Sequence, residues 1–122
     1  MTSPPPPSRD LSPWLPLAPR TFAILLVLAR GRCHGYRLMR ELREGSAGER
    51  WEVGPATLYR TLRTLEQEGL LTAREGPDGE SGGPPRKEYA LSELGHRVAS
   101  AEAARMARLV GVATRRKLVE QE

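Results

Sequence analysis

Residues 54–69 read GPATLYRTLRTLEQEG, a stretch that carries its own start and stop signals for a helix. Gly54 fits an N-cap, and Pro55 fits the first helical position, where its missing N–H loses no hydrogen bond. Gly69 fits the residue after the last turn, because glycine enters the left-handed conformation without steric cost. The stretch therefore predicts a single helix between these two ends.

The two faces of this predicted helix differ in chemistry. Leu58, Leu62 and Leu65 recur at i, i+4 and i+7, which predicts a buried apolar stripe. The opposite face and its flanks carry arginines, hydroxyls and an amide, the groups that contact base edges and phosphates in a DNA major groove. The residues that we expect to contact DNA there are Thr57, Tyr59, Arg60, Arg63 and Thr64. Solvated surface helices carry similar arginines, so the neighbouring segments must decide between the two interpretations.

Composition limits the classes of protein to consider. The chain has 122 residues, enough for one domain with tails, and its net charge of +4 permits a polyanionic partner without requiring one. Cys33 is the only cysteine, which excludes an intramolecular disulfide and favours a reducing cytosol. The longest apolar run, residues 22–29, is far shorter than the ~20 residues that span a bilayer. We expect a soluble, cytoplasmic protein that does not enter the membrane.

The sequence divides the chain into three parts. Residues 1–16 are rich in proline, which disfavours a regular helix or a central strand and predicts an extended or disordered arm. Trp14, Leu15 and Leu17 are expected to dock the end of this arm on the domain. Residues 17–91 form the predicted domain, and residues 92–122 form a predicted C-terminal helix.

Two further helices are predicted before residue 54. Residues 21–30, preceded by Pro19 and followed by Gly31, are apolar on nearly every side and predict a buried central helix. Residues 36–44, followed by Gly45, predict a second helix. Its expected inward residues are Tyr36, Leu38, Met39 and Leu42, and its expected outward residues are Arg37, Arg40 and Arg43. Residues 46–53 are a predicted loop, anchored by Trp51 and Val53. Three short helices in this order predict a helix-turn-helix.

A hairpin is predicted directly after the third helix. Residues 70–75 and 86–91 alternate apolar and polar side chains, so Leu71 and Ala73 should lie opposite Tyr89 and Leu91 across a loop of residues 76–85. A hairpin in this place is a wing. Its base carries Arg86 and Lys87, which we expect to contact the DNA backbone. Asp78 and Glu80 at the predicted tip leave open an ordinary hairpin without a role in DNA binding.

The C-terminal helix predicts a dimer. Ser92 fits its N-cap, and Glu93 lies in its first turn, where the helix dipole favours a carboxylate. Its apolar pattern runs for more than twenty residues with no core left to cover, so the expected partner is the same helix of a second copy. The expected interface residues are Leu94, Val98, Ala101, Met106, Leu109, Val110 and Ala113. The basic residues Arg105, Arg108, Arg115, Arg116 and Lys117 are expected on its solvated face.

These segments together resemble the PadR family of winged-helix transcriptional regulators, over roughly residues 18–95. The resemblance rests on the short motifs Ala23-Ile24-Leu25, His34-Gly35-Tyr36-Arg37-Leu38, Thr57-Leu58-Tyr59 with Leu62 and Leu65-Glu66, Gly69-Leu70-Leu71, and Tyr89-Ala90-Leu91-Ser92 with Gly95. It implies a mainly α (α+β) fold, a winged helix-turn-helix with a C-terminal dimerisation helix. It further implies a homodimeric repressor of a near-palindromic double-stranded DNA operator, released in some members by a small-molecule effector.

The chain departs from the family pattern at two positions of the third helix. The family usually has serine or threonine where Gly54 stands, and glycine where Ala56 stands. The first departure weakens the helix cap by only a few tenths of a kcal/mol. The second places a methyl group where the helix would meet DNA, which would change the base preference. The C-terminal helix also lacks a tryptophan that could stack on a flat ligand.

Other kinds of chemistry have little support in the sequence. His34, His96 and Cys33 are too few for a metal site of fixed spacing, and no phosphate-binding glycine loop or serine-histidine-acid set is present. We expect no enzymatic activity, no cofactor and no metal. His34 is interpreted as a structural hydrogen-bonding residue and Cys33 as a small buried one. Glu66 is interpreted as a pairing or surface carboxylate.

Two alternatives to a DNA-binding repressor stay open at this point. A winged-helix module could bind an acidic protein through the same arginine face, which the modest net charge and the acidic hairpin tip leave open. A ligand sensor with a pocket at the dimer interface is compatible with DNA binding. Steep salt dependence on DNA would separate the first alternative from the repressor.

Overall fold

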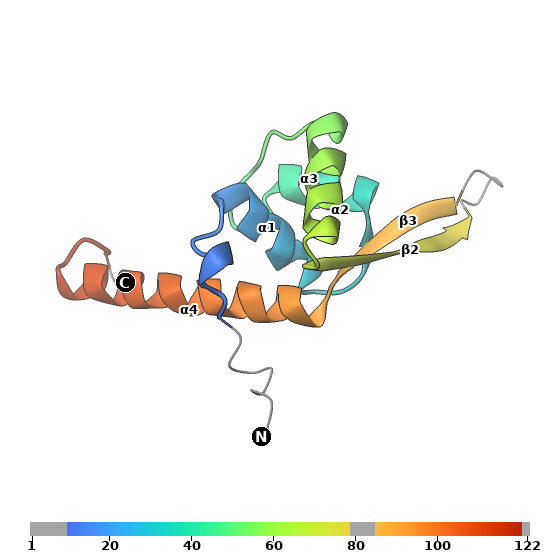
Figure 1. The fold of residues 1–122 in the computed structure, drawn as a ribbon. Helices are drawn as coiled ribbons and strands as arrows, with labels where there is room; N and C mark the ends of the chain where they lie inside the picture. Colours follow the sequence, from blue (N-terminus) through green and yellow to red (C-terminus); the bar gives the residue numbers. More distant parts are fainter. Residues whose placement is uncertain (1–9, 79–84, 121–122) are drawn as a thin grey trace, which may run out of the picture.

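The structure is a computed structural model that describes residues 10–78 and 85–120, without the side chains of residues 77, 78, 85 and 86. Its elements are a short 3-10 helix η2 (Ser12–Trp14), α1 (Pro19–Leu28), β1 (Cys33–His34), α2 (Gly35–Glu44), α3 (Pro55–Gln67), β2 (Leu71–Asp78), β3 (Pro85–Leu91) and α4 (Glu93–Arg115). Helices α1, α2 and α3 gather on one side of α4, and the β2–β3 hairpin projects away from them (Figure 1).

Helix α1 is the central helix of the core, as predicted. Pro19 occupies its first turn, and Ile24 and Leu25 have no exposed surface. The helix packs against α2, α4 and β3. Leu26 is the exception to the expected burial, since 38% of its surface is exposed. The loop before α3 is anchored as expected, with Val53 buried and Trp51 packed against the core.

Helix α2 begins and ends with distinct caps. The Nδ1 atom of His34 accepts a hydrogen bond from the backbone N–H of Arg37 at 3.3 Å, which confirms a structural role for this histidine. Gly45 ends the helix at φ 86°. The predicted inward position of Tyr36 is wrong, because 59% of this residue is exposed. Residues two positions apart on a helix do not share a face, so Tyr36 cannot point inward together with Leu38.

The sheet has three antiparallel strands in the order β1-β3-β2. Leu71 lies opposite Leu91 and Ala73 opposite Tyr89, which confirms the predicted hairpin register. The strands reach further than predicted, to Asp78 and from Pro85, with an irregularity between Glu75 and Asp78. The sequence did not predict β1, in which Cys33 pairs with Tyr89. Glu80 at the predicted hairpin tip lies outside the described residues.

Helix α4 joins the domain at a tight crossing. The Ser92 hydroxyl accepts a hydrogen bond from the N–H of Gly95 at 2.9 Å and donates one to the carbonyl of Gly69. A Cβ atom on Gly95 would overlap the carbonyl oxygen of Leu70. The helix ends earlier than its apolar pattern suggested. Lys117, at φ 63°, turns the chain, and Leu118 lies beyond the helix.

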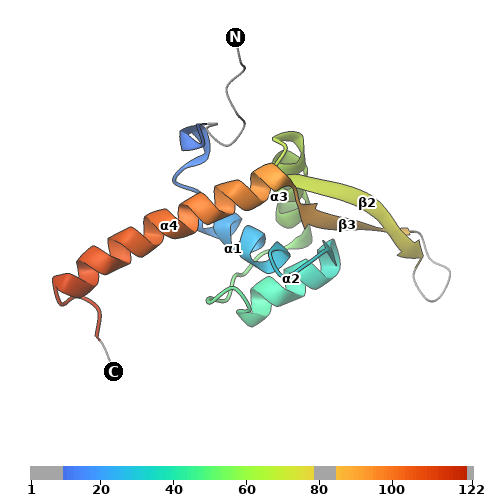
Figure 2. The same ribbon diagram turned by 90° about the horizontal axis from the view of Figure 1, so that it is seen from below.

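The expectation that α4 has no core to cover is wrong for its first half. Val98 has no exposed surface, and Leu94 packs against the core. Val98 therefore belongs to the interior of its own chain and cannot offer a surface to a second copy. The second half of the helix extends past the other helices in both views (Figures 1 and 2).

The end of the proline-rich arm docks on the domain, as predicted. Leu11, Trp14, Leu15 and Leu17 pack against the core, and η2 forms where Pro13 fits the first turn of a short helix. Residues 1–9 of the predicted arm lie outside the described residues. Among the described helices, none is both long and apolar enough to cross a membrane. The whole is a mainly helical α+β fold in which a helix-turn-helix is followed by a hairpin wing, as the sequence predicted.

Candidate nucleic-acid interface

Helix α3 presents one polar face to solvent. Its leucine stripe is buried, since Leu58 and Leu62 have no exposed surface, and this burial fixes which side chains face outward. Arg60, Arg63 and Thr64 are exposed as predicted. Within residues 10–78 and 85–120, neither of these arginines has an acidic partner within 4.0 Å. Two unneutralised guanidinium groups on one helix face are suited to phosphates and guanine edges.

The two threonines of this face differ in exposure and in the hydrogen bonds that they make. The hydroxyl of Thr64 donates to the backbone carbonyl of Arg60 at 3.1 Å, so in this state it is available as an acceptor. Thr57 is half-buried, and its carbonyl accepts the hydroxyl of Thr61 at 3.0 Å. Thr64 is therefore the better placed of the two candidate DNA contacts.

Tyr59 ties α3 to the first turn of α2. An added Cβ atom on Gly35 would lie 2.5 Å from Cε1 and from the hydroxyl of Tyr59, so only glycine leaves room for this ring. The ring is 38% exposed and borders a surface hollow of about 390 Å³. His34, Tyr36 and Lys87 line the rest of that hollow. Tyr59 thus lies on the flank of α3 that faces α2 and the hairpin.

The wing is linked to α3 by an ion pair. The Lys87 Nζ atom lies 3.6 Å from Oε1 of Glu66 and 5.9 Å from the ring centroid of Tyr89. Glu66 is therefore a pairing carboxylate, one of the two roles expected from the sequence. Burial raises the pKa of Tyr89, and the charge of Glu66 adds to this. Arg86 lies in β3, but its side chain is outside the part of the chain that the structure describes.

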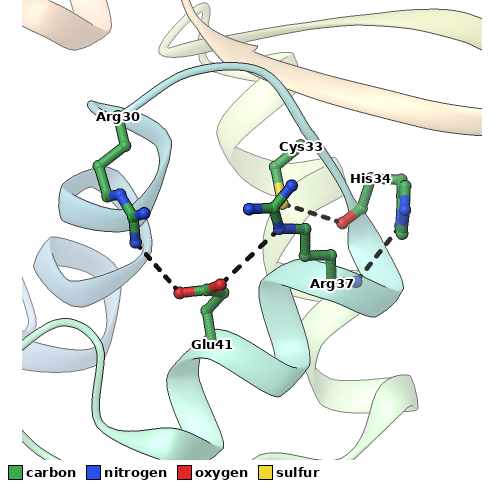
Figure 3. A network of polar contacts seen from close by, with 5 residues as sticks. All are labelled: Arg30, Cys33, His34, Arg37 and Glu41. Carbon is green, nitrogen blue, oxygen red and sulfur yellow. Dashed lines mark hydrogen bonds and ion pairs between the residues drawn. The ribbon is translucent and has the colours of Figure 1, made fainter.

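A polar network ties α2 to the turn that follows α1 (Figure 3). Glu41 Oε1 lies 3.3 Å from NH1 of Arg30, and its Oε2 lies 3.7 Å from Nε of Arg37. A side-chain hydrogen bond from Ser46 lowers the pKa of Glu41, and the two arginines lower it further. The i,i+4 spacing of Arg37 and Glu41 is visible in the sequence, but the contact with Arg30 needs the fold.

Cys33 is buried beside this network. Its Sγ atom donates to the carbonyl of His34 at 3.3 Å, and burial raises the pKa of the thiol. A buried neutral thiol is a poor nucleophile, so its packing role is favoured over redox sensing. Among the described residues, no group of three or more histidine, cysteine or acidic side chains is arranged to hold a metal ion.

The candidate dimer residues fall into two groups. Leu94 and Val98 pack into the domain, and Ala101 is half-buried. Met106, Leu109 and Val110 are 41%, 55% and 53% exposed, and Ala113 lies between them and the end of the helix. Further exposed apolar surface comes from Leu118, the last residue of the predicted apolar pattern, and from Val112 and Val119, which the sequence did not assign to an interface. The apolar surface open to a partner therefore lies in the second half of α4 and in the residues just after it.

A family model and a curated relative that match this chain both describe transcriptional regulators. The model of the Transcriptional regulator PadR-like family matches residues 24–101. The Transcriptional regulator YqjI of Escherichia coli (strain K12) is 36% identical over 72 residues, which cover 59% of this chain and 31% of that protein. The chain thus spans about a third of this relative.

Solved structures of similar fold include the following two. A PadR-like transcription factor from Bacteroides fragilis superposes with a TM-score of 0.65 at 24% identity, covering 77% of this chain and 85% of that one. Bacillus subtilis PadR in complex with operator DNA superposes with a TM-score of 0.60 at 27% identity, covering 70% of this chain and 47% of that one. The first likeness concerns the fold alone, and the second is to a protein bound to its operator.

Proposed function

Since this chain belongs to the PadR-like family of transcriptional regulators, we propose that it is a homodimeric repressor of a near-palindromic DNA operator. The observation that carries the proposal is the outer face of α3, where Arg60 and Arg63 are exposed and have no carboxylate partner among the described residues. Bacillus subtilis PadR, the similar structure bound to operator DNA, supports the same use of this fold.

Each candidate residue has a distinct role in the proposal. Arg60, Arg63 and Thr64 enter the major groove, where guanidinium groups bind guanine edges or phosphates and the hydroxyl oxygen accepts from a base. Tyr59, and less directly Thr57, contact the backbone from the flanks of the helix. Arg86 and Lys87 contact phosphates from the wing. Lys87 exchanges its pair with Glu66 for a phosphate when DNA binds.

The dimer is proposed to form through the second half of α4. Met106, Leu109 and Val110 together expose an apolar strip that a second copy would cover, and each fully buried side chain of this kind contributes about 1.5–3 kcal/mol. Two-fold symmetry would then place the two α3 helices about 34–36 Å apart, which is one turn of DNA. The proposal includes release by a small-molecule effector that binds at this interface.

The test is DNA binding by matched arginine variants. Genomic DNA fragments that the parent protein retains are first isolated from a pool of duplexes. Fluorescence anisotropy then compares the affinities of Arg60→Ala and Arg108→Ala for one of these fragments. Arg108 is an exposed arginine of α4 and serves as the control. Loss of about 1–3 kcal/mol at one base-pair position for Arg60→Ala means that Arg60 reads a base. A loss that is uniform across sequences means that it binds phosphate.

The opposite result would redirect the proposal. If Arg60→Ala and Arg63→Ala both bind the retained fragment as tightly as the Arg108→Ala control, the outer face of α3 is not the DNA surface. If no fragment is retained at all, the arginine face would instead suit an acidic protein partner.

A further inference from the structure

One carboxylate of α4 is buried, and DNA contact gives it no role. Glu102 is 2% exposed, although it stands in the middle of a helix whose neighbouring residues reach solvent. Its Oε2 atom accepts the backbone N–H of Leu17 at 3.1 Å. Arg105 donates from Nε to Oε1 at 2.7 Å and from NH2 to Oε2 at 3.0 Å. The sequence placed Arg105 on the solvated face, whereas it forms a two-pronged pair with Glu102.

Stability alone does not account for this arrangement. Burying the Glu102 carboxylate costs desolvation energy that its pair with the half-exposed Arg105 does little more than offset, so a well-packed apolar residue would stabilise the helix about equally well. A paired and hydrogen-bonded carboxylate instead fixes the arrangement of the groups around it, because its two oxygens satisfy all their donors in only one geometry. The residues that these donors hold together therefore indicate what Glu102 does.

Glu102 lies at the boundary between the two halves of α4. On its N-terminal side, Leu94 and Val98 pack into the domain. On its C-terminal side, Met106 and Leu109 expose the apolar surface proposed for the dimer. In Figures 1 and 2, η2 lies beside the middle of α4, where the helix begins to leave the domain. A contact at this boundary is placed to restrain the direction in which the free half of the helix extends.

The other end of the contact lies near α3, the recognition helix of the proposed DNA complex. Leu17 belongs to the segment of residues 11–18, which lines one side of a surface groove of about 690 Å³. Trp14 and Pro16 line the same side of the groove, while Arg60 and Thr64 of α3 line the other. The segment thus faces the flank of α3 across this groove, and the Leu17–Glu102 hydrogen bond ties it to the boundary point of α4.

From this placement we propose that Glu102 is a positioning residue. It holds the N-terminal segment between α3 and α4, and so fixes the direction of the dimerisation half of α4 relative to the recognition helix. In the homodimer this sets the separation of the two α3 helices. The inference rests on the dimer proposed above.

The experiment measures that separation directly in the full chain. Gln67, an exposed residue of α3, is replaced by cysteine and spin-labelled in a Cys33→Ala background, so that each protomer carries one label. Double electron–electron resonance then reports the distance between the two recognition helices of the dimer. With Glu102 intact we expect one narrow distribution near the 34–36 Å spacing of successive major grooves.

Glu102→Leu is close in size to the parent side chain, but it removes the acceptor for the N–H of Leu17 together with the pair with Arg105. We expect the distance distribution of this variant to broaden by about two-fold, because no hydrogen bond then ties α4 to the Leu17 backbone. Glu93→Leu is the matched control at an exposed carboxylate of the same helix, and its distribution should stay narrow. If Glu102→Leu does not fold, Leu17→Pro removes the donor N–H from the other side of the same contact and must broaden the distribution.

Two outcomes would overturn the inference, and they differ. A narrow, unchanged distance in folded Glu102→Leu and Leu17→Pro dimers overturns the positioning role and leaves the dimer in place. Absence of any inter-protomer distance in the parent protein overturns the dimer and the positioning role together.

Discussion

Replacing Gly35 by alanine tests how α2 and α3 are joined at the candidate interface. The new Cβ atom would lie 2.5 Å from Cε1 and the hydroxyl of Tyr59, and 2.6 Å from its Cζ atom. Ordinary contacts between such atoms begin near 3.5 Å, so the ring must move by about 1 Å. Tyr59 is 38% exposed, so this movement shifts a partly exposed ring and with it a candidate DNA contact.

The expected cost follows from two opposing effects. Overpacking of this kind destabilises a protein by about 1–3 kcal/mol. Alanine in place of a helical glycine gains roughly 0.5–1 kcal/mol, since it restricts the unfolded chain. The net expectation for Gly35→Ala is a loss of about 1–2 kcal/mol in the free energy of unfolding. In a Tyr59→Ala background the clash is absent, so the same change should become neutral or stabilising.

Urea unfolding of the four proteins in this double-mutant cycle measures both numbers. The two substitutions should couple by about 1–3 kcal/mol, the size of the overpacking cost. DNA binding of Gly35→Ala should weaken in parallel, since the displaced ring belongs to the proposed interface. The reasoning is refuted if Gly35→Ala destabilises the Tyr59→Ala protein as much as it destabilises the parent.

Three further predictions concern α4. Gly95→Ala should destabilise the fold by about 3 kcal/mol, because the added methyl group meets the rigid carbonyl of Leu70. The midpoint of thermal unfolding should fall by roughly 10 °C or more. An unchanged midpoint would contradict the close approach of α4 to the Leu70 backbone. The hydrogen bonds from Arg105, followed by that from the Leu17 backbone, lower the pKa of Glu102 below its ordinary 4.5, so the stability that this carboxylate contributes is present above pH 4.5 and is lost as the pH falls through the lowered value. When the pH is lowered below about 4.5, the free energy of unfolding measured in urea should therefore fall less for Glu102→Gln than for the parent. Equal falls in the two proteins would exclude this role. Leu109→Arg places a charge in the exposed apolar strip and should yield monomers in sedimentation experiments at concentrations where the parent is dimeric; a variant that stays dimeric would move the interface elsewhere.

The parts of the fold that the sequence predicts are those encoded by local signals. The ends of α3 follow from Gly54, Pro55 and Gly69, whose backbone preferences act within one turn of the chain. The hairpin register follows from the alternation of apolar residues, because a shift by one residue would turn Leu71 and Tyr89 to the wrong face. The exposed arginines of α3 follow from its leucine stripe in the same way.

The parts that the sequence does not predict depend on distant contacts. Strand β1 has two residues, too few for a periodic pattern, and it forms because β3 offers an edge beside Cys33. The apolar pattern of α4 continues without a break, so it does not reveal that Val98 fills the core while Leu109 reaches solvent. Glu102 accepts a hydrogen bond from the backbone N–H of Leu17, which lies 85 residues away in the chain, and no local signal encodes that contact.

The most direct measurement of the central claim is a salt series on DNA. Binding of the protein to the duplex region upstream of its own gene, to selected genomic fragments and to a scrambled duplex is followed by fluorescence anisotropy, with the stoichiometry determined at saturation. We predict two protomers per site, affinity for at least one natural duplex well above the scrambled control, and a logarithm of the binding constant that falls with that of the salt concentration by about 0.9 per phosphate contacted. Equal, weak binding to every natural and scrambled duplex would contradict sequence-specific DNA binding by this chain.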